Sequence, residues 1–145
     1  MFFTKREPRI SRILIVEDEP LIAFDNEHAL QQAGYTVVAT VDRFRDAEAV
    51  IEGGPVDLVI ADIRLRGVRS GIELARRARG LGIAVLFATA SYPEEESETG
   101  VALGVLAKPF QPRDLIRAIR ICEALLAGRA PGRLPPGLTL FARTD

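Results

Sequence analysis

The sequence lacks tryptophan, contains one cysteine and one histidine, and carries a formal net charge of only −1. A single cysteine, Cys122, excludes an internal disulfide and suits a reducing compartment, so we expect a cytoplasmic protein. The lone histidine, His28, has no partner at metal-ligand spacing, and we expect it on a helix surface. The near-neutral charge argues against general binding to nucleic acid, and no apolar run is long enough to span a membrane. These absences exclude several classes of protein but indicate no substrate.

Short apolar runs are abundant, and they alternate with segments of helical spacing. Hydrophobic residues make up 48% of the 145 residues, which is enough for one domain with a substantial core. The apolar runs predict five strands, at residues 12–16, 35–40, 57–61, 83–89 and 105–108. Helical spacing predicts five helices, at residues 21–34, 42–54, 70–82, 93–104 and 111–128.

Strands that each lead into a helix predict right-handed crossovers and hence a parallel sheet. We therefore predict an α/β fold of the flavodoxin-like, doubly wound kind, with five parallel strands in the order 2-1-3-4-5 and helices on both faces. The domain is expected to span residues 11–128, with residues 1–10 as an N-terminal extension. Residues 129–145 contain three prolines and two glycines, and we assign them as a C-terminal tail.

Polar residues follow four of the predicted strands, at the edge where open parallel sheets bind ligands. Glu17 and Asp18 end the first strand and Asp62 the third, and these strands are neighbours in the predicted order. Three converging carboxylates repel one another unless a cation neutralises them, and oxygen ligands with room for water suit Mg²⁺. Thr89 and Lys108 end the fourth and fifth strands, where a hydroxyl and an ammonium suit an anionic group arriving on Asp62.

With these residues in the segments ILIVEDEP, FATAS and AKPF, the chain resembles the receiver domains of two-component response regulators over residues 11–127. The resemblance implies that Asp62 accepts a phosphoryl group from a sensor histidine kinase. It also implies the ligands of Mg²⁺, which are Glu17, Asp18, Asp62 and the backbone carbonyl of Arg64. Thr89 and Lys108 would hold the phosphoryl oxygens, and Pro109 is the candidate for a cis turn.

A narrower similarity links the chain to stand-alone receivers of alphaproteobacteria that carry an FATG motif after the fourth strand. The segment FATAS is similar to that motif, with Ala90 in place of the glycine. This similarity implies a partner kinase of the HWE type and a role in stress or light signalling. Two features depart from many receivers: residues 105–107 contain no aromatic ring, and Arg66 stands where the loop after Asp62 commonly has a proline.

We expect a phospho-accepting signalling protein that docks to a downstream regulatory protein, as a monomer or weak homodimer. It is not expected to be an enzyme, since a haloacid-dehalogenase-type phosphatase needs a second carboxylate where Arg64 stands. The length of 145 residues argues against a DNA-binding output. A phosphoryl sink and a degenerate receiver that binds partners without phosphorylation stay open as alternatives. Six arginines between residues 64 and 79 leave open a docking surface for an acidic partner.

Overall fold

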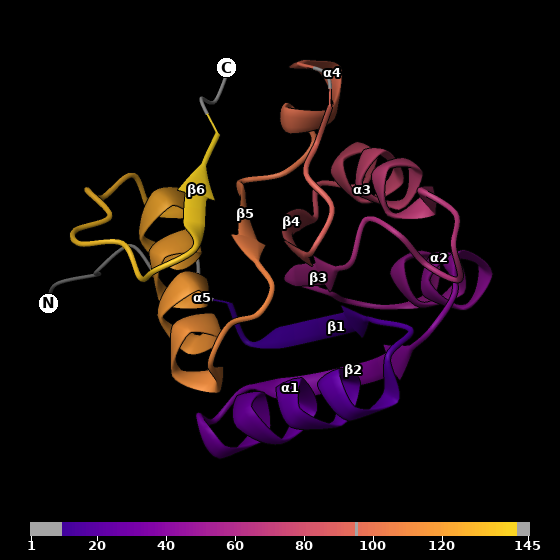
Figure 1. Cartoon of the computed structure of the whole chain (residues 1–145), viewed down its shortest axis with the longest axis horizontal. Helices are drawn as coiled ribbons and strands as arrows, with labels where there is room; N and C mark the ends of the chain where they lie inside the picture. Colours follow the sequence, from indigo (N-terminus) through magenta and orange to yellow (C-terminus); the bar gives the residue numbers. More distant parts are fainter. Residues whose placement is uncertain (1–9, 95, 142–145) are drawn as a thin grey trace, which may run out of the picture.

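The computed structural model describes residues 10–94 and 96–141, which form one six-stranded sheet with helices on both faces (Figure 1). The strands are β1 (Arg12–Val16), β2 (Thr36–Val41), β3 (Leu58–Ala61), β4 (Ala84–Thr89), β5 (Gly104–Ala107) and β6 (Leu138–Leu140). The helices are α1 (Pro20–Gln32), α2 (Phe44–Gly53), α3 (Ser70–Gly80), α4 (Glu96–Thr99) and α5 (Pro112–Leu126). The sheet order is β2-β1-β3-β4-β5-β6, which confirms the predicted order of the five parallel strands. Except for Ile10, the predicted N-terminal extension lies outside the described residues.

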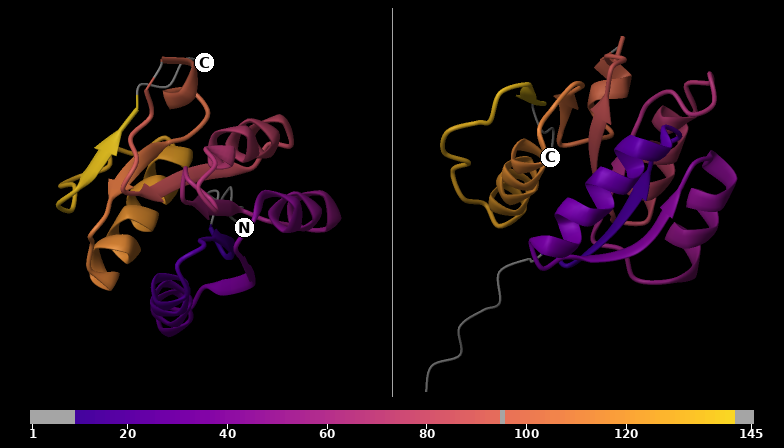
Figure 2. Two further views of the ribbon diagram at one scale, coloured as in Figure 1. Left: turned by 45° about the vertical axis from the view of Figure 1, so that its right-hand side comes forward. Right: turned by 60° about the horizontal axis from the view of Figure 1, so that its bottom comes forward.

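The sheet separates two apolar cores, which is why its inner strands are apolar along their whole length. Along β1, Ile13 and Ile15 lie in the core that includes α1 and α5. Leu14 and Val16 alternate with them and lie in the core that includes α2 and α3. All four side chains are buried, and burying such a side chain stabilises the fold by about 1.5–3 kcal/mol. Figure 2 shows the resulting layers, with α1 and α5 on one side of the sheet and α2 and α3 on the other.

The prediction of five strands was wrong, because residues 138–140 of the predicted tail form β6, which pairs antiparallel with β5 (Figures 1 and 2). Leu138 is buried and Leu140 packs against the same core, so two apolar side chains anchor a three-residue strand. Gly104 of β5 allows β6 to approach closely, since a Cβ at Gly104 would lie 2.5 Å from the carbonyl oxygen of Thr139. The prolines and glycines before β6 are a loop signal and obscured this short apolar alternation. Residues 142–145 of the predicted tail lie outside the described residues.

The helix predicted over residues 93–104 is confined to the four residues of α4. Pro93 precedes it and Gly100 follows it directly, and both residues disfavour a longer helix at these positions. Val101 and Ala102 instead pack against the core of α2 and α3. The chain then enters β5 at Gly104. Residue 95, within the predicted helix, lies outside the described residues. Within residues 10–94 and 96–141, no helix combines the length and apolar character needed to cross a membrane.

Candidate functional site

Four parallel strands bring their C-terminal ends to one edge of the sheet. Val16 of β1 lies beside Ala61 of β3, and the backbone N–H of Asp62 donates to the carbonyl of Val16 at 3.0 Å. The residues that follow β1 and β3 are therefore neighbours. At the next pair, the backbone N–H of Lys108 donates to the carbonyl of Thr89 at 2.9 Å. The predicted convergence of these polar residues is thus observed.

The acidic cluster is formed by Glu17, Asp18 and Asp62, whose nearest carboxylate oxygens lie within 4.8 Å of one another. Glu17 and Asp62 are buried, and Asp18 is half-buried. Burial raises the pKa of Glu17 above its usual value, although a hydrogen bond from Lys108 acts in the opposite direction. A set of hard oxygen ligands that includes no histidine or cysteine fits Mg²⁺. The described contacts do not test the carbonyl of Arg64 as a further ligand, and that role stays a prediction.

Lys108 supplies the positive charge of this site. Its Nζ lies 2.6 Å from Oε1 of Glu17, 2.7 Å from Oδ2 of Asp62 and 2.8 Å from Oε2 of Glu19. Burial disfavours the ammonium, but the hydrogen bonds to Asp62, Glu17 and Glu19 outweigh burial and raise the pKa of Lys108. One ammonium therefore faces four carboxylates once Asp18 is included, and the site remains short of positive charge. Glu19 was not predicted as a site residue, and its only sequence signal is its place directly after the acidic pair.

Thr89 orients the carboxylate of Asp62 and is itself fixed by backbone groups. Its hydroxyl donates to Oδ1 of Asp62 at 2.6 Å and accepts from the N–H of Ser91 at 3.1 Å. The N–H of Arg64 donates to the same Oδ1 at 3.2 Å, while Lys108 binds Oδ2. Both oxygens of Asp62 are thus hydrogen-bonded. The Asp62 carboxylate can be buried at the end of a core strand because both of its oxygens accept hydrogen bonds.

The loop after Asp62 contains a tight turn at Arg66 and Gly67, which have φ angles of 52° and 79°. Leu65 and Val68 flank it and exchange two backbone hydrogen bonds, of 2.8 and 3.1 Å, and positive φ at both central residues matches a type I′ turn. The N–H of Arg66 donates to Oδ2 of Asp18 at 2.7 Å. Proline, common here in receivers, could neither adopt this φ nor make this bond. Its absence therefore has a structural reason.

Gly71, the second residue of α3, lies against the backbone of the phosphoacceptor candidate. Its N–H donates to the carbonyl of Ile63 at 2.9 Å. A Cβ at this position would collide with the carbonyl oxygen of Asp62 and lie 2.7 Å from Cα of Ile63. Gly71 is therefore a site residue that the sequence analysis missed. Its signal was a glycine at a helix start, where glycine is otherwise unfavourable.

The basic face of six arginines is balanced by local partners. Arg66 pairs with Asp42, Arg69 with Glu98, Arg76 with Glu73, and Arg77 with Glu48. Arg64 and Arg79 donate to the backbone carbonyls of Gly67 and Gly100. These contacts argue against a free docking surface for an acidic partner.

The remaining predicted features lie near Lys108. The Lys108–Pro109 peptide bond is cis, which confirms that prediction. Val105 and Leu106 are buried in β5, so no ring from this stretch lies beside Thr89. His28 is exposed and stacks on Phe24, as expected of a surface residue.

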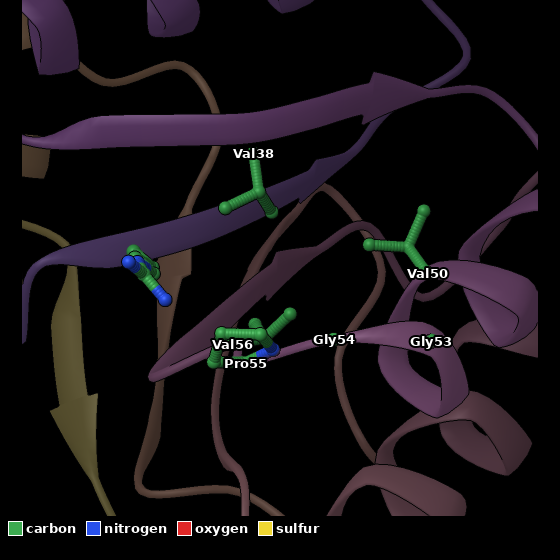
Figure 3. Close-up of a pocket in the computed structure, with 7 residues that line it drawn as sticks. Val38, Val50, Gly53, Gly54, Pro55 and Val56 are labelled. Carbon is green, nitrogen blue, oxygen red and sulfur yellow. The ribbon is translucent and has the colours of Figure 1, made fainter.

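A pocket at the other end of the strands lies away from these groups. Arg12, which begins β1, and Val56, which precedes β3, line it together with Val38 (Figure 3). Because β1 and β3 run parallel, their first residues lie at the edge opposite Glu17 and Asp62. This pocket is therefore no part of the acidic site.

Comparisons with known proteins place this geometry among response regulators. Residues 13–120 match the family model of the response regulator receiver domain. The uncharacterized transcriptional regulatory protein YbdJ of Bacillus subtilis is 37% identical over 113 residues, or 75% of this chain and 49% of YbdJ. The transcriptional regulatory protein PdtaR of Mycobacterium tuberculosis is 32% identical over 114 residues, or 76% of this chain and 55% of PdtaR.

A solved structure is similar over most of the domain. The CheY-like receiver domain protein from Methanospirillum hungatei has a TM-score of 0.71 and 28% identity, and covers 81% of this chain and 97% of its own. The chain spans about half the length of the curated relatives it matches. Since both are named transcriptional regulators, the length argument against a DNA-binding output does not extend beyond these 145 residues.

Proposed function

Because the chain belongs to the response regulator receiver domain family, we propose that Asp62 accepts a phosphoryl group from a sensor histidine kinase in a reaction that requires Mg²⁺. The observation that carries this proposal is the pair of hydrogen-bonded oxygens on Asp62, with Thr89 on one and Lys108 on the other. Thr89 and Lys108 hold the two oxygens in fixed positions, and a carboxylate oxygen is the nucleophile of such a transfer. This arrangement is the reason to favour phosphorylation over the alternative of a phosphorylation-independent binding module.

In the proposed transfer, a carboxylate oxygen of Asp62 forms a bond to phosphorus as the bond to the kinase imidazole breaks. The leaving imidazole takes the electron pair, so the phosphoryl group passes from nitrogen to oxygen with no other reactant. Mg²⁺, held by Glu17, Asp18 and Asp62, would neutralise charge on the phosphoryl oxygens. Lys108 and Thr89 already contact Asp62, so both are in place to donate to the phosphoryl oxygens afterwards.

A pocket beside Lys108 offers a path for the donor. Glu19 and Asn26 line it from the α1 side, and Pro109 and Phe110 from the β5–α5 turn. On α1 itself, Leu21 and Phe24 are 80% and 66% exposed. We propose that the kinase docks over α1, and the FATAS segment favours a kinase of the HWE type.

The output is proposed to be a change in docking to a regulatory protein domain, within a longer chain or on a separate one. Both possibilities follow from the relatives, which are transcriptional regulatory proteins about twice as long as the matched segment. No enzymatic activity on other substrates is proposed, since Glu17, Asp18, Thr89 and Lys108 are assigned here to the phosphorylation of Asp62 itself.

The test is incubation with acetyl phosphate, with and without Mg²⁺, followed by intact-mass measurement. The wild-type chain should gain one phosphoryl group only with Mg²⁺, and Asp62→Asn should gain none. Asp46→Asn is the matched control, because Asp46 lies exposed in the first turn of α2, away from the site. Equal phosphorylation of Asp62→Asn and wild type would refute the proposal.

A further inference from the structure

The edge of β5 is covered by a segment of the chain's own C-terminal region. β5 pairs with β4 on one side and with β6 on the other, where Val105 lies opposite Thr139. Two further backbone bonds extend this pairing: Ala107 N–H to the carbonyl of Gly137 at 2.9 Å, and Phe141 N–H to the carbonyl of Leu103 at 3.0 Å. β6 thus uses the donors and acceptors that an open sheet edge would offer to an extended segment.

The β5 edge is shaped for a strand of a particular pattern. Gly104 leaves room for the backbone of Thr139, since a Cβ there would lie 2.5 Å from the Thr139 carbonyl oxygen. Leu138 and Leu140 face the core of α1 and α5, while Thr139 between them is exposed. A segment that binds here needs apolar residues at two positions separated by one, and the residue between them can be polar because Thr139 is exposed.

β6 is a small element with few anchors of its own. It has three residues, and the segment from 127 to 137 that joins it to α5 contains three prolines and three glycines with positive φ, at 128, 132 and 137. Short edge elements with few buried side chains open at lower free energy than the core strands. Replacing β6 therefore need not disturb β1, β3 or β4.

One end of β6 is bonded next to the proposed phosphorylation site, and the other is bonded to the segment that leads away from Thr89. Gly137 accepts from Ala107, and the next residue, Lys108, binds Thr89 through its backbone and Asp62 through Nζ. At the other end, Phe141 donates to Leu103, which closes the segment that begins at Thr89. A movement of Lys108 or of the Thr89–Leu103 segment would therefore strain the two bonds that flank the β5–β6 pairing.

We propose that the β5 edge is a strand-docking surface, that β6 is its resident cover, and that phosphorylation of Asp62 releases β6 so that a partner protein's extended segment takes its place. The partner segment is extended, with apolar residues at two positions separated by one, as in Leu138-Thr139-Leu140. The release step rests on the proposed function, whereas the docking surface does not.

The docking surface is tested without phosphorylation. Thr139→Pro removes the backbone N–H opposite Val105, and Thr139→Val retains it and is the matched control. The probe is a labelled peptide of residues 136–141, whose binding is followed by fluorescence anisotropy. Thr139→Pro should bind the peptide at least about tenfold more tightly than Thr139→Val, because the competing strand is weakened. Equal affinities for the two variants would overturn the proposal.

The release step is tested by amide exchange of residues 137–141 with and without Mg²⁺ and beryllofluoride, a phosphoryl mimic. Exchange there should rise about tenfold in the wild type and change little in Thr139→Pro, whose β6 is already loosened. The release step is overturned if exchange is unchanged although the same protein is phosphorylated by acetyl phosphate and Mg²⁺, as measured by intact mass. Failure to phosphorylate refutes the proposed function instead and leaves the peptide comparison valid. A dimer that forms on activation and is lost in Thr139→Pro would identify a second copy's β6 as the occupant and overturn the partner segment.

Discussion

Replacement of Gly71 by alanine perturbs the candidate site through the backbone alone. The added methyl would collide with the carbonyl oxygen of Asp62 and lie 2.7 Å from Cα and 2.9 Å from the carbonyl oxygen of Ile63. All three obstacles are main-chain atoms, so no side-chain rotation relieves them. Either α3 moves away from β3 or the Asp62–Ile63 peptide shifts.

The size of the effect follows from two opposing contributions. Overpacking of a well-packed site costs about 1–3 kcal/mol, and a backbone obstacle places Gly71→Ala toward the upper end. Alanine regains at most about 1 kcal/mol of helix propensity over glycine. The net loss of unfolding free energy should be about 1–2 kcal/mol. A shifted Asp62 also loses its alignment with Thr89 and Lys108, which should slow phosphorylation by about tenfold or more.

Gly80, at the other end of α3, provides the matched control. A Cβ there meets no atom within 4 Å, so Gly80→Ala should leave stability unchanged or raise it by up to about 1 kcal/mol. Urea unfolding of both variants measures stability, and acetyl phosphate with intact mass measures the rate of phosphorylation. If Gly71→Ala is as stable as Gly80→Ala and is phosphorylated at the wild-type rate, the steric reasoning is refuted.

Three further predictions concern charge and mobility. Asp18→Asn should keep the fold, because the amide oxygen can still accept from Arg66, yet lose Mg²⁺-dependent phosphorylation; an unchanged rate with acetyl phosphate would contradict this. Lys108 has a folded-state pKa above 10.5, since its ion pairs outweigh its burial, so its contribution to stability is complete below pH 10.5 and is lost as pH rises through the folded value. The difference in urea stability between wild type and Lys108→Met should therefore be constant below pH 10.5 and shrink steadily above it, and a difference that stays undiminished above pH 10.5 would disprove the coupling. Residues 90–104 should be less protected from amide exchange than α1 and gain protection with beryllofluoride, and protection equal to that of α1 without a response would exclude Thr89 as the start of a moving segment.

Much of the site could be predicted because it depends on strand ends. Asp62, Thr89 and Lys108 each follow an apolar run directly, and parallel strands place such residues at one edge. Glu17 joins them because β1 and β3 are neighbours in the sheet. No detail of side-chain packing was needed for this inference, since strand order and direction suffice.

Contacts made by the main chain were not predictable in the same way. The N–H of Arg66 binds Asp18, which lies 48 positions earlier in the chain, and nothing about an arginine signals that role. Gly71 was one glycine among 12, and its importance lies in the Asp62 and Ile63 backbone that approaches it. Glu19 became a site residue only through the reach of Lys108 from β5.

The sequence by itself determined the alternation of strands and helices and the chemistry at the edge of the sheet, because apolar runs and the residues that end them are local properties. Only the tertiary structure decided that Leu138–Leu140 form a sixth strand, because three residues carry too little periodicity to predict one. That strand exists because Gly104, 34 positions before Leu138, lacks a side chain and the core of α1 and α5 accepts Leu138. Both conditions are long-range contacts, which arise when the chain has folded.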